Sequence, residues 1–181
     1  RWTPIREVTK ISRRHLRSVA SDKSTRFKKN IENKVLIAED ALQITATLDE
    51  HKHVPQGGVY FGTAMKSNIN LKVILALLNS RLLSNIYQFL FSGMHMGGGY
   101  LRYRTSFLEE LPVADVSNNE ISKIITHVNR ILAITKNEDY LQNSQKQAQV
   151  KTLEREIDQM VYQLYGLTGD EIRIVEGSVG K

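Results

Sequence analysis

The sequence of 181 residues contains no cysteine at all. This absence excludes a disulfide-stabilised scaffold, and it excludes any zinc site that uses thiolate ligands. A chain without cysteine suits a reducing compartment, and we expect a cytoplasmic protein. With 41% hydrophobic and 24% charged residues, the composition is typical of one globular domain, or of one small domain with an appendage.

Uninterrupted apolar segments long enough to span a membrane are also lacking. The longest apolar stretch, residues 71–93, is broken by Lys72, Arg81 and several Asn and Ser residues, so it favours a buried helix and no membrane contact. The first ten residues, RWTPIREVTK, are charged from the start and do not resemble a signal peptide. Because the chain begins without Met and in the middle of a pattern, we expect it to be part of a longer protein.

The sequence also lacks recognisable catalytic motifs. The sequence has no Gly-x-Ser-x-Gly, no phosphate-binding loop that ends in Lys-Ser/Thr, and no carboxylate cluster typical of a nuclease. The stretch DEHKH, residues 49–53, places two histidines on one face of an extended chain, but it leads into a Pro-Gly turn and marks no third ligand. We therefore predict a solvated turn rather than a metal site, and a chain that binds rather than catalyses.

Positive charge is present, and it is concentrated at one end of the chain. The net charge is +6, yet residues 1–36 hold eleven Lys or Arg against three acidic residues, whereas residues 37–181 hold fourteen against sixteen. A basic block neutralises phosphates and releases their counterions, which gives affinity for nucleic acid without sequence preference. The alternative is a solvated linker without a partner, and the composition leaves both interpretations open.

The chain divides into three parts by composition and periodicity. Residues 1–33 form a basic linker or the start of the next part, residues 34–116 form an α/β core, and residues 117–181 are helical in pattern. Within the core, residues 34–38, 42–49 and 59–65 are strand-like, which predicts a small antiparallel or mixed sheet. Residues 71–90 follow three-four spacing and predict one long helix packed on that sheet, or two consecutive helices if Asn79 to Arg81 interrupt it.

The last third of the sequence predicts a helical hairpin. Ser117 and Glu120 match a capping box, and apolar seams follow in residues 121–132 and 150–164. Gly166 fits the left-handed position just past the second helix, and residues 168–171 match another capping box that begins a short terminal helix. The predicted fold class is therefore mixed α/β (α+β), a small sheet packed on a long helix and followed by a C-terminal helical hairpin.

The stretch GMHMGGGYLRYR, residues 93–104, is the strongest candidate for binding. Its three consecutive glycines allow the backbone to take unusual conformations and to approach a ligand closely. Arg102 and Arg104 flank Tyr103, so both arginines share one side of an extended chain, and guanidinium groups suit phosphates as well as guanine. The alternative is a loop whose arginines remain in solvent while Leu101 and Tyr103 fill the core.

Three stretches in this order, LKVILALLNSRLLSNIYQFLFSG, GGGYLRYRTSFLEELPV and IDQMVYQLYGLTGDEIRIVEG, resemble the TaqI-like C-terminal specificity domain of bacterial restriction-modification enzymes. The resemblance extends over residues 34–177. In that family the domain follows an adenine-specific DNA methyltransferase, often fused to an endonuclease. The resemblance implies a non-catalytic target-recognition module that docks on double-stranded DNA beside its own N-terminal catalytic domains. S-adenosylmethionine and Mg would belong to those domains, and no cofactor is expected in this chain.

The residues nominated for DNA contact combine the glycine-rich stretch with basic residues elsewhere. They are Arg102, Arg104, Tyr100, Tyr103, His95, Gly97, Gly98, Gly99, Arg13, Arg14, Arg26, Lys28, Lys29, Lys34 and Lys66. No catalytic residue and no metal ligand is nominated. Two alternatives remain: a protein-interaction module whose hairpin binds partner helices, as in type I specificity subunits, and an independent nuclease.

Overall fold

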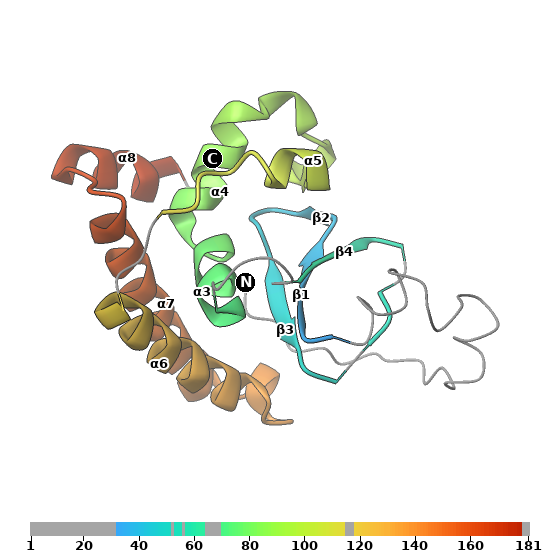
Figure 1. The fold of residues 1–181 in the computed structure, drawn as a ribbon, viewed down its shortest axis with the longest axis vertical. Helices are drawn as coiled ribbons and strands as arrows, with labels where there is room; N and C mark the ends of the chain where they lie inside the picture. Colours follow the sequence, from blue (N-terminus) through green and yellow to red (C-terminus); the bar gives the residue numbers. More distant parts are fainter. Residues whose placement is uncertain (1–31, 52, 56, 64–69, 115–117, 179–181) are drawn as a thin grey trace.

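The computed structural model describes residues 32–51, 53–55, 57–63, 70–114 and 118–178. Figure 1 shows the strands on one side of the molecule and the longest helices on the other, with shorter helices between them. Several predictions lie outside the described residues, namely the Ser117 cap and the nominated contacts Arg13, Arg14, Arg26, Lys28, Lys29 and Lys66.

Three short strands form an antiparallel sheet in which β1 (Lys34–Ala38) lies between β3 (Ala46–Asp49) and β4 (Val59–Gly62). The three predicted strands are therefore present. The third ends at Gly62, before Thr63 and short of the predicted residue 65, and the second begins only at Ala46 rather than at residue 42. The reason is that Ile44 leaves the sheet: its amide donates to Ser84 Oγ at 3.2 Å rather than to a neighbouring strand. Ile44 is nevertheless completely buried, which explains why the alternating apolar pattern continues beyond the strand.

The apolar segment after the sheet forms two consecutive helices, α3 (Leu71–Leu78) and α4 (Arg81–Leu90), bent by 61°. The break lies at Asn79, whose side chain donates to the carbonyl oxygen of Ala46 at 3.0 Å and accepts from its amide at 2.9 Å. Ser80 then caps α4 with its hydroxyl. The interruption that the sequence indicated is thus a tertiary contact, because Asn79 holds the helix break against β3.

Short elements connect α4 to the last helices. They are η1 (Ser92–Met94), η2 (Gly97–Gly99), β5 (Leu101–Arg102) and α5 (Thr105–Leu108). β5 pairs antiparallel with β2 (Asp40–Ala41), so residues far apart in the sequence form a second, two-stranded sheet. This pairing brings the glycine-rich stretch to the end of β1.

The C-terminal part is the predicted helical hairpin. It consists of α6 (Asn118–Thr135), the short η3 (Tyr140–Gln142) and α7 (Ser144–Leu164), and α8 (Gly169–Ser178) follows. Gly166 has the left-handed backbone conformation expected after a helix, with φ of 65°. The predicted capping box is also present, since the Thr168 amide donates to Glu171 Oε2 at 2.7 Å.

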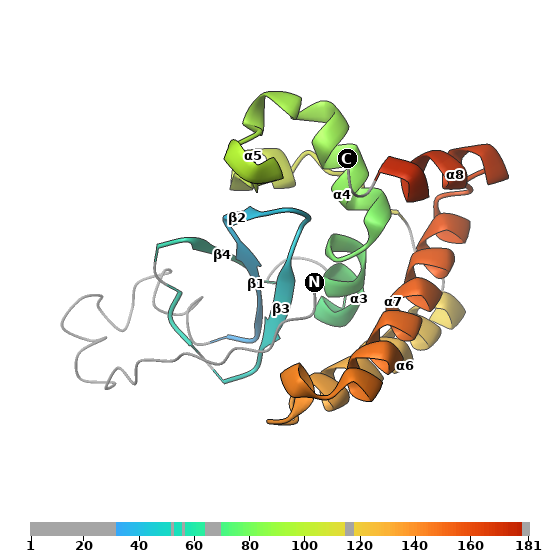
Figure 2. The ribbon, with the colours of Figure 1, turned by 180° about the vertical axis from the view of Figure 1, so that it is seen from behind.

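The helices form layers over the sheet, and one hydrophobic core runs through all of them. α3 packs on the sheet and against α6, while α4 packs against α7 and α8, as the two opposite views show (Figures 1 and 2). The core extends without interruption from Val35 in β1 to Val175 in α8. The mixed α/β fold class is confirmed, and the apolar seam of the hairpin is covered by α3 and α4 of the same chain.

Within the part of the chain that the structure describes, no single helix combines the length and the apolar character needed to cross a bilayer. Among the described helices, α3 and α4 counted together reach the required length and apolar composition, but the pair is bent by 61°.

Candidate nucleic-acid interface

The glycine-rich stretch forms a tight loop that protrudes from the β2–β5 pair. His95 lies opposite Leu101 in an antiparallel bridge, and the Met96 amide donates to the Tyr100 carbonyl oxygen at 2.7 Å. The turn between them is Gly97–Gly99, in which Gly98 and Gly99 have φ of 75° and 79°. Only glycine adopts this conformation at low cost, so the turn itself requires glycine at these two positions.

The base of this loop is fixed to the core through Tyr87. Its hydroxyl donates to the Arg102 carbonyl oxygen at 2.8 Å and accepts from the Arg104 amide at 3.2 Å, so one side chain holds both flanks of Tyr103. The Tyr103 amide donates to the Glu39 carbonyl oxygen at 2.7 Å. Burial raises the pKa of both phenols, Tyr87 and Tyr103, so both stay neutral at physiological pH. A glycine turn is thus mounted on a rigid base.

Tyr103 itself lies in the interior, which corrects its nomination as a surface contact. The residue is fully buried, and its ring centroid lies 4.7 Å from that of Tyr87. Its hydroxyl has no hydrogen-bond partner among the described residues. The structure therefore supports the alternative in which Tyr103 fills the core while the loop around it remains at the surface.

The two arginines of the stretch have different surroundings. Arg102 is paired in two places with Asp40, from Nε to Oδ1 at 3.0 Å and from Nη2 to Oδ2 at 3.3 Å, and its Nε lies 3.9 Å from Glu39 Oε1. The hydrogen bonds with Asp40 raise the pKa of Arg102 further above its ordinary value. Its charge is therefore permanent, but two carboxylates of the β1–β2 corner already compensate it.

Arg104 is exposed, and no carboxylate among residues 32–114 and 118–178 as described forms an ion pair with its guanidinium. Its backbone is nevertheless held by the Tyr87 hydroxyl, so the side chain starts from a fixed position. On the loop, Tyr100 is 46% exposed and His95 is exposed as well. The Arg104 guanidinium, the Tyr100 ring and the glycine turn are therefore all exposed to solvent. Proteins use groups of these kinds to contact nucleic acids.

Lys34 does not belong to this surface, although the sequence nominated it. Its Nζ lies 2.6 Å from Asp49 Oδ2, and both side chains are completely buried. The physical reason for the correction is the position of Lys34 at the start of the central strand, where Asp49 is its partner in register on β3. A buried ammonium group held by a carboxylate is not available to a phosphate.

The same carboxylate explains the histidines of the DEHKH stretch. Asp49 accepts from the amides of His51 and His53 at 3.0 and 2.9 Å, and its Oδ1 lies 2.7 Å from His53 Nδ1. Burial by itself raises the pKa of Asp49, but these hydrogen bonds and that of Lys34 outweigh it and keep the pKa below its ordinary value. The Asp49 oxygens are thus occupied by protein donors, and the cluster stabilises the turn after β3.

Several residues that define the candidate interface were missed by the sequence analysis. Tyr87 lies on α4, and the three-four pattern of residues 71–90 did not single it out. Glu39 and Asp40 follow β1 directly, but nothing in the sequence links them to Arg102, which lies 62 residues from Asp40. The β2–β5 pairing makes these contacts, and such short strands carry no recognisable periodicity.

Together these features describe a mixed α/β domain whose anchored glycine loop displays an uncompensated arginine. Comparison with protein families gives this description a name: the model of the TaqI-like C-terminal specificity domain matches residues 6–113. The match covers more than half of the chain, and the chain belongs to this family. The expected resemblance is therefore confirmed, and a specificity domain implies an interaction with DNA. A search of curated proteins found no match to the chain.

The limits of the family match differ from those of the expected resemblance. The match begins at residue 6, so it includes the basic N-terminal segment, and it ends at residue 113, before the helical hairpin. Tyr165 of the segment after α7 bridges this boundary, because its hydroxyl donates to the Pro112 carbonyl oxygen at 2.7 Å and accepts from the Ala114 amide at 3.2 Å. The hairpin is thus attached to the matched part by hydrogen bonds as well as by the shared core.

Proposed function

We propose that this chain is the DNA target-recognition module of a methyltransferase-fused, type II restriction-modification enzyme. The observation that carries the proposal is the glycine loop, which is exposed at its tip, fixed at its base and flanked by the uncompensated guanidinium of Arg104. Membership of the specificity-domain family supports a DNA target rather than another anion. The module docks on duplex DNA in the cytoplasm and holds the register of the complex.

In this proposal the loop approaches the sugar-phosphate backbone. Phosphate contacts fix the orientation of a protein on the duplex, whereas base contacts carry the sequence information. An exposed guanidinium beside a glycine turn that permits close approach is suited to the first of these roles. Arg104 then contacts a phosphate, Tyr100, His95 and the three glycines lie against the backbone, and Arg102 remains paired with Asp40 as part of the loop's support.

Catalysis in this proposal takes place outside the chain. An adenine methyltransferase that binds S-adenosylmethionine, with or without an endonuclease that uses Mg, occupies the N-terminal part of the complete enzyme. Methylation of a base requires that the base leave the stack, so the role of the module is to hold the duplex while the catalytic domain acts.

Replacing Arg104 with alanine is expected to weaken DNA binding equally for preferred and unrelated sequences. Because one phosphate contact is lost, the slope of log affinity against log salt should fall by about 1. The measurement is a salt titration of binding to two fluorescent duplexes, a sequence selected from a random pool and an unselected one. Arg102→Ala should have a smaller effect on the slope, since Glu39 and Asp40 already compensate that charge.

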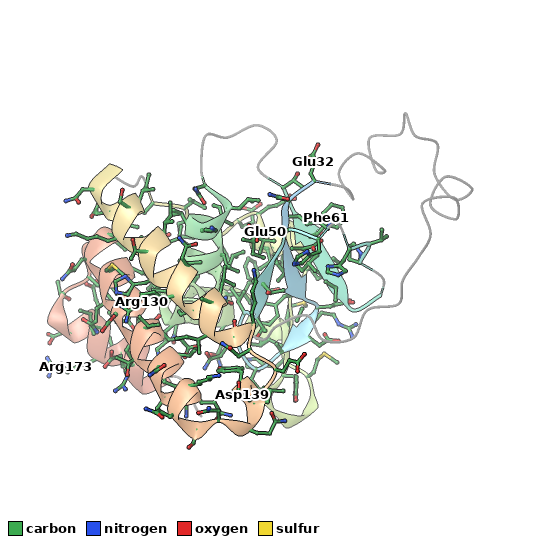
Figure 3. The ribbon with its side chains drawn as sticks, turned by 90° about the horizontal axis from the view of Figure 1, so that it is seen from below. Glu32, Glu50, Phe61, Arg130, Asp139 and Arg173 are labelled. Carbon is green, nitrogen blue, oxygen red and sulfur yellow. The ribbon has the colours of Figure 1, made fainter. Side chains whose placement is uncertain are left out.

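The matched control is Arg130→Ala, which removes one exposed arginine from α6, on the hairpin side of the molecule (Figure 3). This variant should keep the wild-type slope. An Arg104→Ala variant that binds both duplexes as wild type does would remove the loop from the interface. A loss confined to the selected duplex would instead assign base reading to Arg104 and contradict the backbone contact.

The basic N-terminal segment provides an independent test of the same function. We expect the double variant Lys28→Ala/Lys29→Ala to reduce the salt slope by about 2 if both residues neutralise phosphates. Circular dichroism spectra should be unchanged, and the preference for the selected duplex should persist. If the salt slope did not change, the segment would instead be a solvated linker without a partner.

A further inference from the structure

A second cationic site lies where the hairpin meets the helix break. An open pocket of about 500 Å³ is lined by Gln43, Arg81, Lys151, Glu154 and Arg155. These residues come from three places: the connection between β2 and β3, the first turn of α4, and one face of α7. The lining therefore brings three cations together with one carboxylate. The described residues as a whole contain more acidic than basic side chains, so this concentration of positive charge is local.

Two of these cations, Lys151 and Arg155, lie on α7. Lys151 and Arg155 lie one helical turn apart, and Arg155 Nε donates to the Lys151 carbonyl oxygen at 3.3 Å, which turns the guanidinium back toward the lysine. Neither side chain forms an ion pair with any residue that the structure describes. Like charges at this spacing destabilise a helix slightly, and an anion bound between them would relieve that repulsion.

The third cation is held in place. Asp158 is buried, accepts from the Arg81 amide at 2.8 Å, and its Oδ2 lies 3.4 Å from Arg81 Nε. This contact fixes the start of α4 and the guanidinium of Arg81, which remains one-third exposed toward the pocket. Gln43 adds an uncharged amide to the lining. A fixed arginine, a lysine, a second arginine and an amide are donors suited to phosphate oxygens.

One residue of the pocket, Gln43, directly follows a segment that contacts the glycine loop. Ala41 pairs with Leu101 at the base of the loop, and a methyl group of Leu42 lies 3.7 Å from the position that a Cβ on Gly99 would occupy. Gln43 of the pocket is the next residue, and two residues of chain span at most about 7 Å. The segment that leads from β2 to β3 runs from the loop toward the helices in both ribbon views (Figures 1 and 2).

We infer that this pocket binds a phosphate group, and that the group is a backbone phosphate of the DNA docked on the glycine loop. The inference rests on the proposed function and extends it, because Lys151 and Arg155 lie beyond residue 113, where the family match ends. The hairpin then has a second role, since it contributes a phosphate anchor that the matched domain lacks. The duplex is held at two points, by Arg104 at the loop and by α7 at the pocket.

The test compares two double variants that remove the same charge. Lys151→Ala/Arg155→Ala empties the pocket of its uncompensated cations, and Lys123→Ala/Arg130→Ala removes an exposed lysine and an exposed arginine from α6. With a mixed-sequence duplex, the pocket variant should lose about 0.9 in salt slope for each phosphate contact that is lost, and the α6 variant should keep the wild-type slope. All four residues are exposed, so both variants should unfold at the wild-type denaturant concentration.

Inorganic phosphate separates a free anion from a backbone phosphate. Titration followed by NMR should shift the Gln43 and Arg81 amides weakly in wild type and not in the pocket variant, and duplex DNA should suppress these shifts. If the pocket variant and the α6 variant had equal salt slopes, the pocket would not contact a DNA phosphate. The proposed function would not be affected by that result, because Arg104→Ala tests it separately. If wild type binds no duplex, both the proposed function and the assignment of the pocket to a backbone phosphate are wrong. Saturable NMR shifts with inorganic phosphate would then support a site for free phosphate. If inorganic phosphate caused no shifts either, the pocket would not be a phosphate site.

Discussion

Replacing Asp49 with alanine is expected to lower the free energy of unfolding by about 3–5 kcal/mol, because the change leaves a buried charge without its partner. The lost contact joins Asp49 Oδ2 to Lys34 Nζ at 2.6 Å, with both side chains fully buried between β1 and β3 of the sheet. The same change frees the amides of His51 and His53, which would lose their common acceptor. Urea unfolding followed by circular dichroism measures the loss.

The controls separate this buried pair from ordinary surface pairs. Lys34→Met should also destabilise the protein, since Asp49 would remain buried and charged. The double variant Lys34→Met/Asp49→Leu should recover the part of the loss that comes from the unpaired charge, but not the part that comes from the His51 and His53 amides. Lys136→Met removes a lysine whose Nζ lies 4.0 Å from Glu50 in an exposed pair, and it should cost less than about 1 kcal/mol. If Lys34→Met were no more harmful than Lys136→Met, the buried pair would not be a source of stability.

The pH dependence of the same variant provides a further check. Since the pKa of Asp49 is lower in the folded chain than its ordinary value, its contribution is fully present above about pH 4 and is lost as the pH falls through the folded pKa. The difference in unfolding free energy between wild type and Asp49→Ala should therefore be largest near neutral pH and should narrow in acid. A difference that stays constant down to the lowest pH at which wild type is folded would contradict this assignment.

The sequence predicted the parts of the fold that depend on local periodicity. A compact apolar run marked the first strand, alternation marked the second, and three-four spacing marked the helices, because each pattern reflects how a single element is buried. Gly166 marked the end of α7, because the position after a helix favours a left-handed backbone. The length of the second strand was predicted wrongly because Ile44 is buried by a contact with α4 rather than by the sheet. Ile44 outside the strand and Ala46 inside it are both buried, so the apolar pattern does not distinguish the two situations.

The candidate site was harder to predict, because it depends on contacts between distant residues. The glycine loop was recognised from its composition, yet Arg102 and Arg104 appear equivalent in the sequence and become different only through Asp40 and Glu39. Lys34 was grouped with the basic segment that precedes it, although its register opposite Asp49 places it in the interior. Pairing across strands decides which charges remain available to a ligand, and one sequence does not reveal that pairing.

Tyr103 provides the second large effect, and it separates support of the loop from contact with DNA. Tyr103→Ala is expected to lower the free energy of unfolding by about 3–5 kcal/mol, because it leaves a cavity beside Tyr87 in the core. Tyr103→Phe should be neutral or slightly stabilising, since the hydroxyl is buried without a hydrogen-bond partner among the described residues. Both values follow from urea unfolding.

The DNA affinities of the tyrosine variants distinguish the two roles. Tyr103→Phe should bind duplex DNA as wild type does, whereas Tyr100→Phe and Tyr100→Ala, at an exposed position on the loop, should leave stability unchanged and weaken binding, the alanine variant more strongly. Because Tyr87 holds the backbone on both sides of Tyr103, a stable Tyr103→Phe variant with impaired binding would mean that the loop opens and exposes this ring to the DNA. The expected result assigns Tyr103 to the support of the loop and Tyr100 to its contact surface.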